Sequence, residues 1–204
     1  MTRPYAVLLI ILVGAFGFWY LFAKGGSAEK ITREGPVIFF GDSLTAGVGA
    51  AQGEDFPTFV AQELGLANYI NAGVSGDTTE TALSRLQTDV IRKNPSLVVV
   101  ELSGNDFLAG ADVDETISNL DTIVGQIRQT GSAAVLVHIK FPQKTKKYED
   151  GFRKISEQYD AEVVWNVLDG IAGDPSLMAD TTHPNSAGYK LMAERIAKVL
   201  GKIL

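Results

Sequence analysis

The stretch VIFFGDSLTAGVGA, residues 37–50, begins with four apolar residues and continues into a turn that contains three glycines. An apolar run that ends in such a turn is typical of a strand buried on both faces of a parallel sheet. The turn then presents Ser43. A turn in this position can bind a phosphate group or present a nucleophile, and the rest of the sequence decides between these roles.

Four more apolar runs follow, at residues 69–71, 97–102, 134–139 and 163–167. Between them lie segments whose apolar residues recur with helical spacing, of which residues 78–95 and 112–131 are the longest. Alternating strands and helices predict a three-layer α/β domain with a parallel sheet. In such a fold, ligands bind beyond the carboxyl ends of the strands, so we expect the chemistry at that edge.

The composition excludes several classes of protein. The chain has 204 residues, a net charge of −6 and no cysteine. An acidic chain lacks the clustered Lys and Arg with which proteins bind nucleic acids, so we expect no nucleic-acid partner. Without cysteine there are no disulfides, cysteine-based zinc sites or thiol nucleophiles.

Residues 5–23 carry no charge. As a helix this segment would span about 28 Å, close to the apolar thickness of a bilayer. We therefore expect residues 1–24 to form a transmembrane anchor, residues 25–35 a linker and residues 36–204 one globular domain. The alternative is a cleaved signal peptide, for which GGSAE at 25–29 offers a weak cleavage site.

The side of the membrane on which the domain lies is a separate question. Arg3 precedes the apolar segment, whereas Lys24, Lys30 and Arg33 follow it. Counted alone, these charges place the domain in the cytoplasm.

A phosphate-binding role for the 37–50 turn conflicts with its sequence. The G-x-x-x-x-G-K-[ST] pattern is absent, and the glycines at 47 and 49 lack the third glycine of a dinucleotide fingerprint. No Lys or Arg occurs between Glu34 and Ser84, whereas six acidic residues do. The α/β-hydrolase pattern G-x-S-x-G also fails, since Thr45 replaces its second glycine. A nucleophilic Ser43 must therefore belong to another kind of hydrolase.

A serine nucleophile needs a base within hydrogen-bond reach, and the chain has two histidines. His138 lies inside an apolar run and is interpreted as a buried strand histidine with a satisfied partner. His183 follows Asp180 in the loop DTTHPN, where a carboxylate can orient the imidazole. A turn capped by Asp180 before the last helix is the alternative.

An acyl-transfer site also needs donors for the oxyanion. The backbone N–H of Ser43, the backbone at Gly76 and the side-chain amide of Asn105 all follow predicted strands. A turn glycine and a loop asparagine are the alternatives for the last two. The neighbouring residues Asp42, Asp77 and Asp106 are expected to hydrogen-bond loop backbone and fix its geometry.

Four short blocks together resemble the SGNH/GDSL hydrolase family. They are GDSLTAGVG, NAGVSGDT, ELSGND and DTTHPN, and they occur in the order of the family. The residues of these blocks are most similar to those of the bacterial thioesterase, lysophospholipase and arylesterase subgroup. The resemblance implies a flavodoxin-like five-stranded parallel sheet in the order 2-1-3-4-5. It also implies that no metal or organic cofactor is needed.

The resemblance implies a role for each matching residue. Ser43 would be the nucleophile, His183 the general base and then acid, and Asp180 the residue that orients His183. Ser43, Gly76 and Asn105 would donate to the oxyanion. Relatives in this subgroup are typically exported, which favours a membrane-anchored domain in the periplasm or outside the cell, against the Lys and Arg count.

The expected substrates are acyl esters, thioesters or lysophospholipids. Phe107, Leu108 and Phe141 would line a groove for the acyl chain, or else serve as ordinary loop anchors. Lys144–Tyr148 could meet a phosphate head group or form a solvated helix start. A deacetylase of a cell-surface glycan is the alternative activity, and a tethered binding module without activity is the alternative class. The sequence indicates no oligomeric state.

Overall fold

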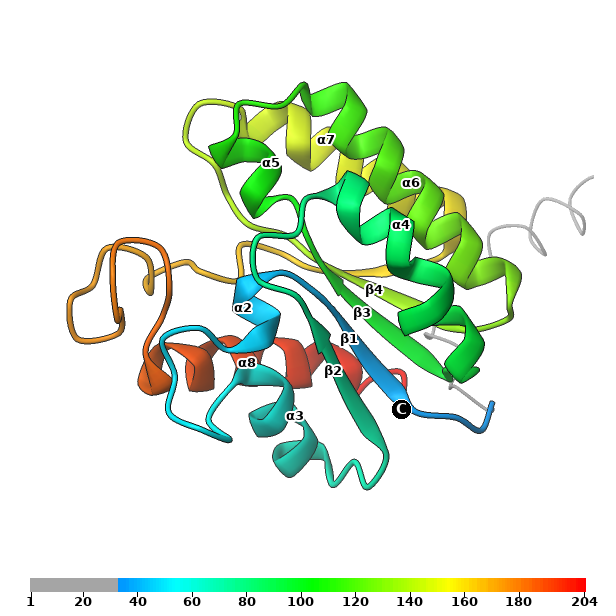
Figure 1. The fold of residues 1–204 in the computed structure, drawn as a ribbon, viewed down its shortest axis with the longest axis horizontal. Coiled ribbons are helices and arrows are strands. Elements are labelled where there is room, and N and C mark those ends of the chain that lie inside the picture. The colour runs from blue at the N-terminus through cyan, green and yellow to red at the C-terminus, as the bar shows by residue number, and fades with distance from the viewer. Residues whose placement is uncertain (1–32) are drawn as a thin grey trace, which may run out of the picture. The chain divides into compact units, whose positions relative to one another are not determined.

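A five-stranded sheet forms the middle layer of the structure, a computed structural model that describes residues 33–204 (Figure 1). All neighbouring strands are parallel, in the order β2-β1-β3-β4-β5. This confirms the predicted order 2-1-3-4-5. The strands are β1 (Val37–Gly41), β2 (Tyr69–Gly73), β3 (Leu97–Glu101), β4 (Ala133–Val137) and β5 (Glu162–Val164).

Helices cover both faces of the sheet. Figure 1 shows α3 and α8 on one face and α4, α6 and α7 on the other. The central strands β1 and β3 are buried along their whole length, which explains why their sequences are apolar rather than alternating. The helices are α2 (Ser43–Ala46), α3 (Phe56–Leu64), α4 (Thr79–Asp89), α5 (Gly104–Leu108), α6 (Val113–Gln129), α7 (Thr145–Tyr159) and α8 (Ser186–Leu200), with a 3-10 turn at Ile91–Lys93.

Polar residues at the helix N-termini fix where the helices begin. Asp55 caps α3 by accepting from the N–H of Thr58, and Asn185 caps α8 by accepting from the N–H groups of Ala187 and Gly188. Both helices therefore begin directly after loops at the carboxyl edge of the sheet. The side chains on these loops lie next to helix N-termini whose positions the caps fix.

The last predicted strand is too long. The sequence predicts a strand over 163–167, but β5 ends at Val164 and pairs with β4 only. Asn166 adopts a left-handed conformation with φ 51°, which turns the chain away from the sheet edge. Residues 165–185 then form a long loop of turns that leads to α8.

The predicted anchor or signal segment at 1–24 and most of the linker at 25–35 lie outside the described residues. Their assignment stays a prediction. Within residues 33–204, no helix has both the length and the apolar character needed to cross a bilayer.

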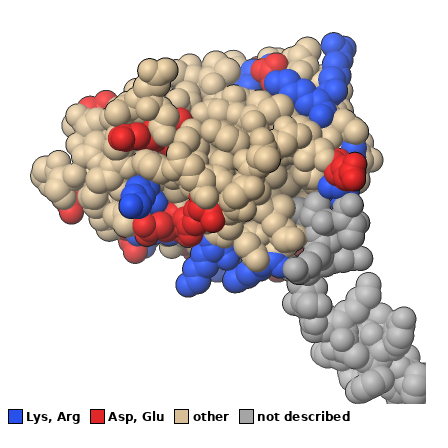
Figure 2. All heavy atoms as spheres, turned by 90° about the horizontal axis from the view of Figure 1, so that it is seen from below, with Lys and Arg blue, Asp and Glu red and all other residues tan. Residues whose placement is uncertain are grey.

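Charged side chains are dispersed on the face seen in Figure 2. Lys and Arg lie in small groups beside Asp and Glu, among larger areas of uncharged side chains. The described residues on this face form no continuous basic surface.

Ser103, after β3, has a strained backbone. Its φ of 111° lies in the left-handed region that favours glycine, its side chain is fully buried, and its hydroxyl has no hydrogen-bond partner. We expect Ser103→Gly to raise the free energy of unfolding by about 1 kcal/mol, because it removes both penalties. Urea unfolding measures this change.

Ser103→Ala is the matched control, because it removes the hydroxyl and keeps the β-carbon. The glycine variant should be the more stable of the two by the cost of the left-handed conformation. A glycine variant no more stable than the wild-type protein would contradict this account.

Candidate active site

Ser43 lies at the carboxyl end of the central strand β1. It is the first residue of the short helix α2, so its backbone N–H is not used by the helix itself. Asp42 caps this helix by accepting from the N–H of Leu44 at 2.9 Å. Ser43 is only 8% exposed, so its hydroxyl is held in place by surrounding protein.

His183 approaches Ser43 from the loop before α8. Its Nε2 lies 3.0 Å from the Ser43 hydroxyl, and its Nδ1 lies 2.8 Å from Oδ2 of Asp180. The structure thus brings the three predicted triad residues into one chain of hydrogen bonds. With the proton on Nδ1, Nε2 is free to accept the proton of the serine hydroxyl.

Asp180 is held by the turn that carries His183. Its Oδ1 accepts from the backbone N–H groups of Thr182 and His183, both at 2.7 Å. The hydrogen bond to the His183 ring and these backbone bonds lower the pKa of Asp180 to about 2. The carboxylate therefore stays charged next to the imidazole throughout the neutral range.

Two contacts hold α8 and the turn of His183 against the residues that follow α2. The hydroxyl of Tyr189 on α8 donates to the carbonyl of Val48 at 2.7 Å. Gly49, with φ 93°, passes so close to the turn that a β-carbon would lie 2.6 Å from the carbonyl oxygen of Pro184 and 3.3 Å from Cβ of His183. Neither the role of Tyr189 nor the close approach at Gly49 could be predicted from the sequence, because both depend on contacts between distant parts of the chain.

The predicted oxyanion residues lie at the same edge. Gly76 has φ 85° and open space where a side chain would extend. Nδ2 of Asn105 donates to Oδ2 of Asp42 at 3.1 Å and to the carbonyl of Asp77 at 2.9 Å. Both amide hydrogens of Asn105 are thus engaged with the protein itself. An oxyanion would have to share or replace one of these acceptors.

The expected hydrogen bonds to backbone are confirmed for Asp42 and Asp106, whereas the carboxylate of Asp77 accepts from the side chains of Thr81 and Arg85. Asp106 accepts from the backbone N–H of Thr79 at 2.9 Å and from its hydroxyl at 2.5 Å. Asp77 pairs with Arg85, which also donates to the carbonyl of Gly41. These bonds tie the loops after β2 and β3 to the helices behind them.

His138 is buried, as expected, but it lacks the expected partner. It follows β4 and lies between the rings of Phe152 and Trp165. Neither ring nitrogen has a hydrogen-bond partner, and burial lowers the pKa of the imidazole. The residue is part of the aromatic core on the α7 side of the sheet.

Two of the predicted acyl-binding residues touch each other. The rings of Phe107 and Phe141 stack with centroids 4.3 Å apart. Leu108, beside them in sequence, is 66% exposed. Phe107 and Leu108 belong to α5, directly after Asn105, so this apolar group continues from the oxyanion side of the site.

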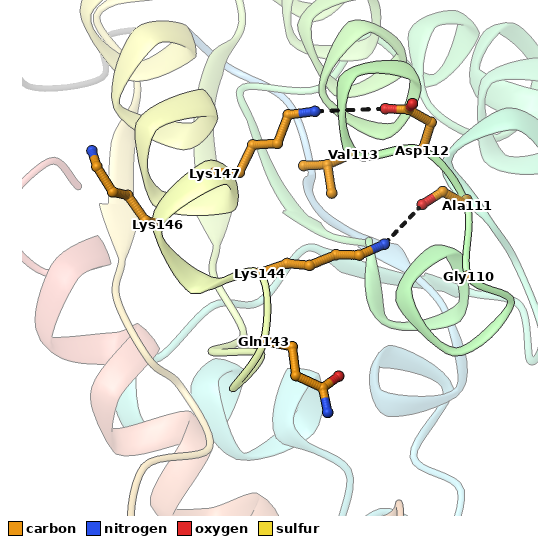
Figure 3. A pocket seen from close by; sticks show the side chains of 8 residues that line it. All are labelled: Gly110, Ala111, Asp112, Val113, Gln143, Lys144, Lys146 and Lys147. Carbon is orange, nitrogen blue, oxygen red and sulfur yellow. Dashed lines mark hydrogen bonds and ion pairs between the residues drawn. The ribbon is translucent and has the colours of Figure 1, made fainter.

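A separate pocket of about 610 Å³ lies between residues 110–113 and 143–147 (Figure 3). Lys144 reaches across it and donates to the carbonyl of Ala111 at 3.3 Å, while Lys147 pairs with Asp114 at 2.9 Å. These lysines therefore link the two segments that form the pocket. The predicted acyl-binding residues are not among those that line it. Within residues 33–204, no cluster of His, Asp and Glu is arranged to hold a metal ion.

Comparison with known proteins identifies the family of this chain. A model of the GDSL-like lipase/acylhydrolase family matches residues 39–191. The chain belongs to this family. This GDSL esterase is 29% identical to the arylesterase of Vibrio mimicus over 206 residues, which cover 96% of this chain and all of the relative. It is 27% identical to thioesterase 1/protease 1/lysophospholipase L1 of Escherichia coli K12, with 80% and 82% of the two chains covered.

The fold of the GDSL esterase is shared with solved structures of esterases. The crystal structure of TesA superposes with a TM-score of 0.78 at 26% identity, over 83% of this chain and 99% of that one. AlinE4, an esterase of the SGNH-hydrolase family, superposes with a TM-score of 0.65 at 31% identity, over 85% and 98%. The resemblance inferred from the four sequence blocks is thereby confirmed.

The close approach at Gly49 leads to a prediction. Gly49→Ala should lower both the free energy of unfolding and kcat for an ester substrate, because its β-carbon would push against the turn of His183. Thermal unfolding and steady-state kinetics measure the two effects. We expect the free energy of unfolding to fall by about 2 kcal/mol.

Gly53→Ala is the control. Gly53 also has a positive φ, 78°, but nothing lies within 4 Å of the position its β-carbon would take. It should lose about 1 kcal/mol of stability and keep its kcat. Equal kcat values for the two variants would show that the turn of His183 does not depend on Gly49.

Proposed function

We propose that the chain is a serine esterase that hydrolyses acyl esters or thioesters through an acyl-enzyme on Ser43. The observation that carries this proposal is the continuous chain of hydrogen bonds from the Ser43 hydroxyl through His183 to Asp180. Its geometry meets the requirement for activating a hydroxyl at neutral pH.

The proposed reaction has two similar halves. Nε2 of His183 takes the proton of Ser43 as Oγ attacks the carbonyl carbon, and Asp180 stabilises the imidazolium that forms. His183 then protonates the leaving alcohol or thiol. In the second half His183 removes a proton from water, which attacks the acyl-enzyme, and the protonated ring returns its proton to Ser43.

The oxyanion would be stabilised from three elements. The backbone N–H of Ser43 lies at the start of α2, Gly76 follows β2, and the Asn105 amide belongs to α5. Asn105 has to turn one hydrogen from its protein acceptors toward the oxyanion, so its contribution grows as negative charge develops on the substrate.

Exposed apolar side chains support a substrate with an apolar acyl group. Among the described residues, the exposed large apolar side chains are Val48, Val74, Leu108 and Leu204. The first three follow β1, β2 and β3 at the carboxyl edge, and the N–H of Val48 donates to the Ser43 carbonyl. We propose that they line the acyl site together with Phe107, and that the buried ring of Phe141 supports Phe107 from behind.

The names of the relatives fit this substrate class, since they include an arylesterase and a thioesterase/lysophospholipase. Attachment to a membrane through the N-terminal segment, with the domain in the periplasm or outside the cell, remains part of the proposal. It rests on the apolar sequence at 5–23.

Ser43→Ala tests the nucleophile. We expect it to reduce kcat for p-nitrophenyl esters by at least about 10³-fold, with no loss of thermal stability, because only the attacking atom is removed. A fluorophosphonate probe should label the wild-type protein at Ser43 and leave this variant unlabelled. Esterase activity that survives the substitution, or a wild-type protein that the probe does not label, would refute the proposal.

The acyl site is tested by Leu108→Ser with Leu204→Ser as control. Leu204 is also an exposed leucine, but it ends the chain beyond α8, away from the carboxyl edge (Figure 1). We expect Leu108→Ser to lower kcat/KM for p-nitrophenyl octanoate about 3- to 10-fold, since part of the burial of one side chain is lost.

The same variants are measured with p-nitrophenyl acetate and with an acetylated xylan oligosaccharide. The acetyl substrates should respond little to Leu108→Ser, and Leu204→Ser should change none of the rates. If the wild-type protein prefers the acetylated glycan, the deacetylase alternative replaces the proposed substrate class.

A further inference from the structure

A carboxyl group outside the triad lies behind the nucleophile. Glu101 is the last residue of β3, and in the sheet it is paired with Gly41, the last residue of β1. Its side chain is fully buried. An ionised carboxylate in such a place is costly unless a cation or several donors satisfy it.

The groups around Glu101 are not cations that would satisfy a charge. The hydroxyl of Thr45 on α2 donates to Oε2 at 2.9 Å, and Oε1 has no partner among the ordinary hydrogen-bond donors. Asp42 directly follows Gly41, the strand partner of Glu101, and its negative charge repels that of Glu101. Tyr189 on α8 is the other titratable group that interacts with this charge.

Asp42 is the second member of a carboxyl pair. It is nearly fully buried, and its two oxygens accept from the N–H of Leu44 and from Nδ2 of Asn105. Two carboxyl groups can hydrogen-bond to each other only if a proton lies between them. Burial and mutual repulsion raise the pKa of Glu101 well above its usual range, and burial raises the pKa of Asp42 to about 6.

We propose that Glu101 is a positioning residue of the active site, which keeps its proton and donates it to Asp42 while accepting from Thr45. In this arrangement one neutral group holds both the turn of the nucleophile, through Thr45, and the oxyanion amide, through Asp42 and Asn105. The inference rests on the proposed function, because it assigns Glu101 a role in placing Ser43 and Asn105.

The glycine before Asp42 gives this arrangement independent support. A β-carbon at Gly41 would overlap the Thr45 hydroxyl and would lie 2.9 Å from Oε2 of Glu101. Gly41 has an ordinary φ, so its backbone does not require glycine. The Thr45 hydroxyl and the Glu101 carboxyl group, which are hydrogen-bonded to each other, occupy the space that a side chain at residue 41 would need.

The stability of Glu101→Gln across pH tests the protonation state. The amide copies a protonated carboxyl group, since it donates to Asp42 and accepts from Thr45, but it cannot ionise. A carboxyl group that keeps its proton in the folded chain loses stability as pH rises above its ordinary pKa of 4.5. The Tm of Glu101→Gln relative to wild type should therefore increase steadily from pH 5 to pH 9.

Other titratable groups near the pair are present in both proteins. They are His183, Asp77 with its partner Arg85, and Tyr189. Taking the difference between the two Tm curves removes most of their contribution. Glu157→Gln, which changes an exposed carboxylate on α7, is the control and should show no such trend. A flat difference for Glu101→Gln, or one that falls with pH, would overturn the inference.

Kinetics test the positioning role. Glu101→Gln should keep kcat within about threefold of wild type, whereas Glu101→Met, which offers neither a donor nor an acceptor, should lower kcat about 10- to 100-fold with little change in KM. The rate of fluorophosphonate labelling should follow kcat. Wild-type kcat in Glu101→Met, or a Gln variant as slow as the Met variant, would overturn the role.

If Glu101→Met does not fold, Thr45→Val replaces it, because it removes the hydroxyl bond and keeps the side-chain shape. It should then lower kcat, and unchanged kcat would overturn the role. Failure of the proposed function is recognised separately, as a wild-type protein without esterase activity and without labelling. The stability comparison needs no activity and still decides the protonation of Glu101.

Discussion

The pairing of β1 with a strand on each side is the constraint on which the site depends. β1 bonds to β2 and β3 in parallel, with Gly41 opposite Gly73 on one side and Glu101 on the other. The loops after these three strands must therefore leave the sheet side by side. Ser43, Gly76 and Asn105 come from different parts of the chain and meet only because the hydrogen bonds of the sheet fix this register.

Aspartates hold this edge together through donors that the loops would otherwise leave unpaired. Asp42 accepts from the backbone of α2, Asp106 from that of α4, and Asp77 anchors Arg85. Buried backbone N–H groups need such acceptors, and charge-assisted bonds are stronger than neutral ones. The acidic character of the four blocks thus has a structural explanation besides its chemical one.

Much of the architecture could be predicted from the sequence, because strands buried on both faces have continuous apolar runs. That Ser43, Asp180 and His183 would lie together could be predicted because they belong to blocks with a recognisable order, and their hydrogen bonds bear this out. Two features could not be predicted. The left-handed Ser103 and the early end of β5 at Val164, two residues before the left-handed Asn166, depend on local backbone geometry that residue type does not reveal.

The contacts within the site were harder still to predict, because they join residues that only the tertiary structure brings together. Tyr189 looks like an ordinary core residue of α8, and only the fold shows its bond to Val48. The two bonds from Asn105 Nδ2 likewise depend on loops that are distant in sequence. His138 lacks the expected hydrogen-bond partner, and its ring packs against the aromatic rings of Phe152 and Trp165 instead.

Asp180 and His183 lie on one turn, three residues apart, whereas Ser43 is 140 residues away in sequence. The proposed triad therefore consists of two parts, and the part with Asp180 and His183 lies at the end of the long loop 165–185. The proposed base and the carboxylate that orients it therefore share one backbone turn, through the bonds from Oδ1 of Asp180 to the N–H groups of Thr182 and His183. Any change in the position of this turn moves both groups together relative to Ser43.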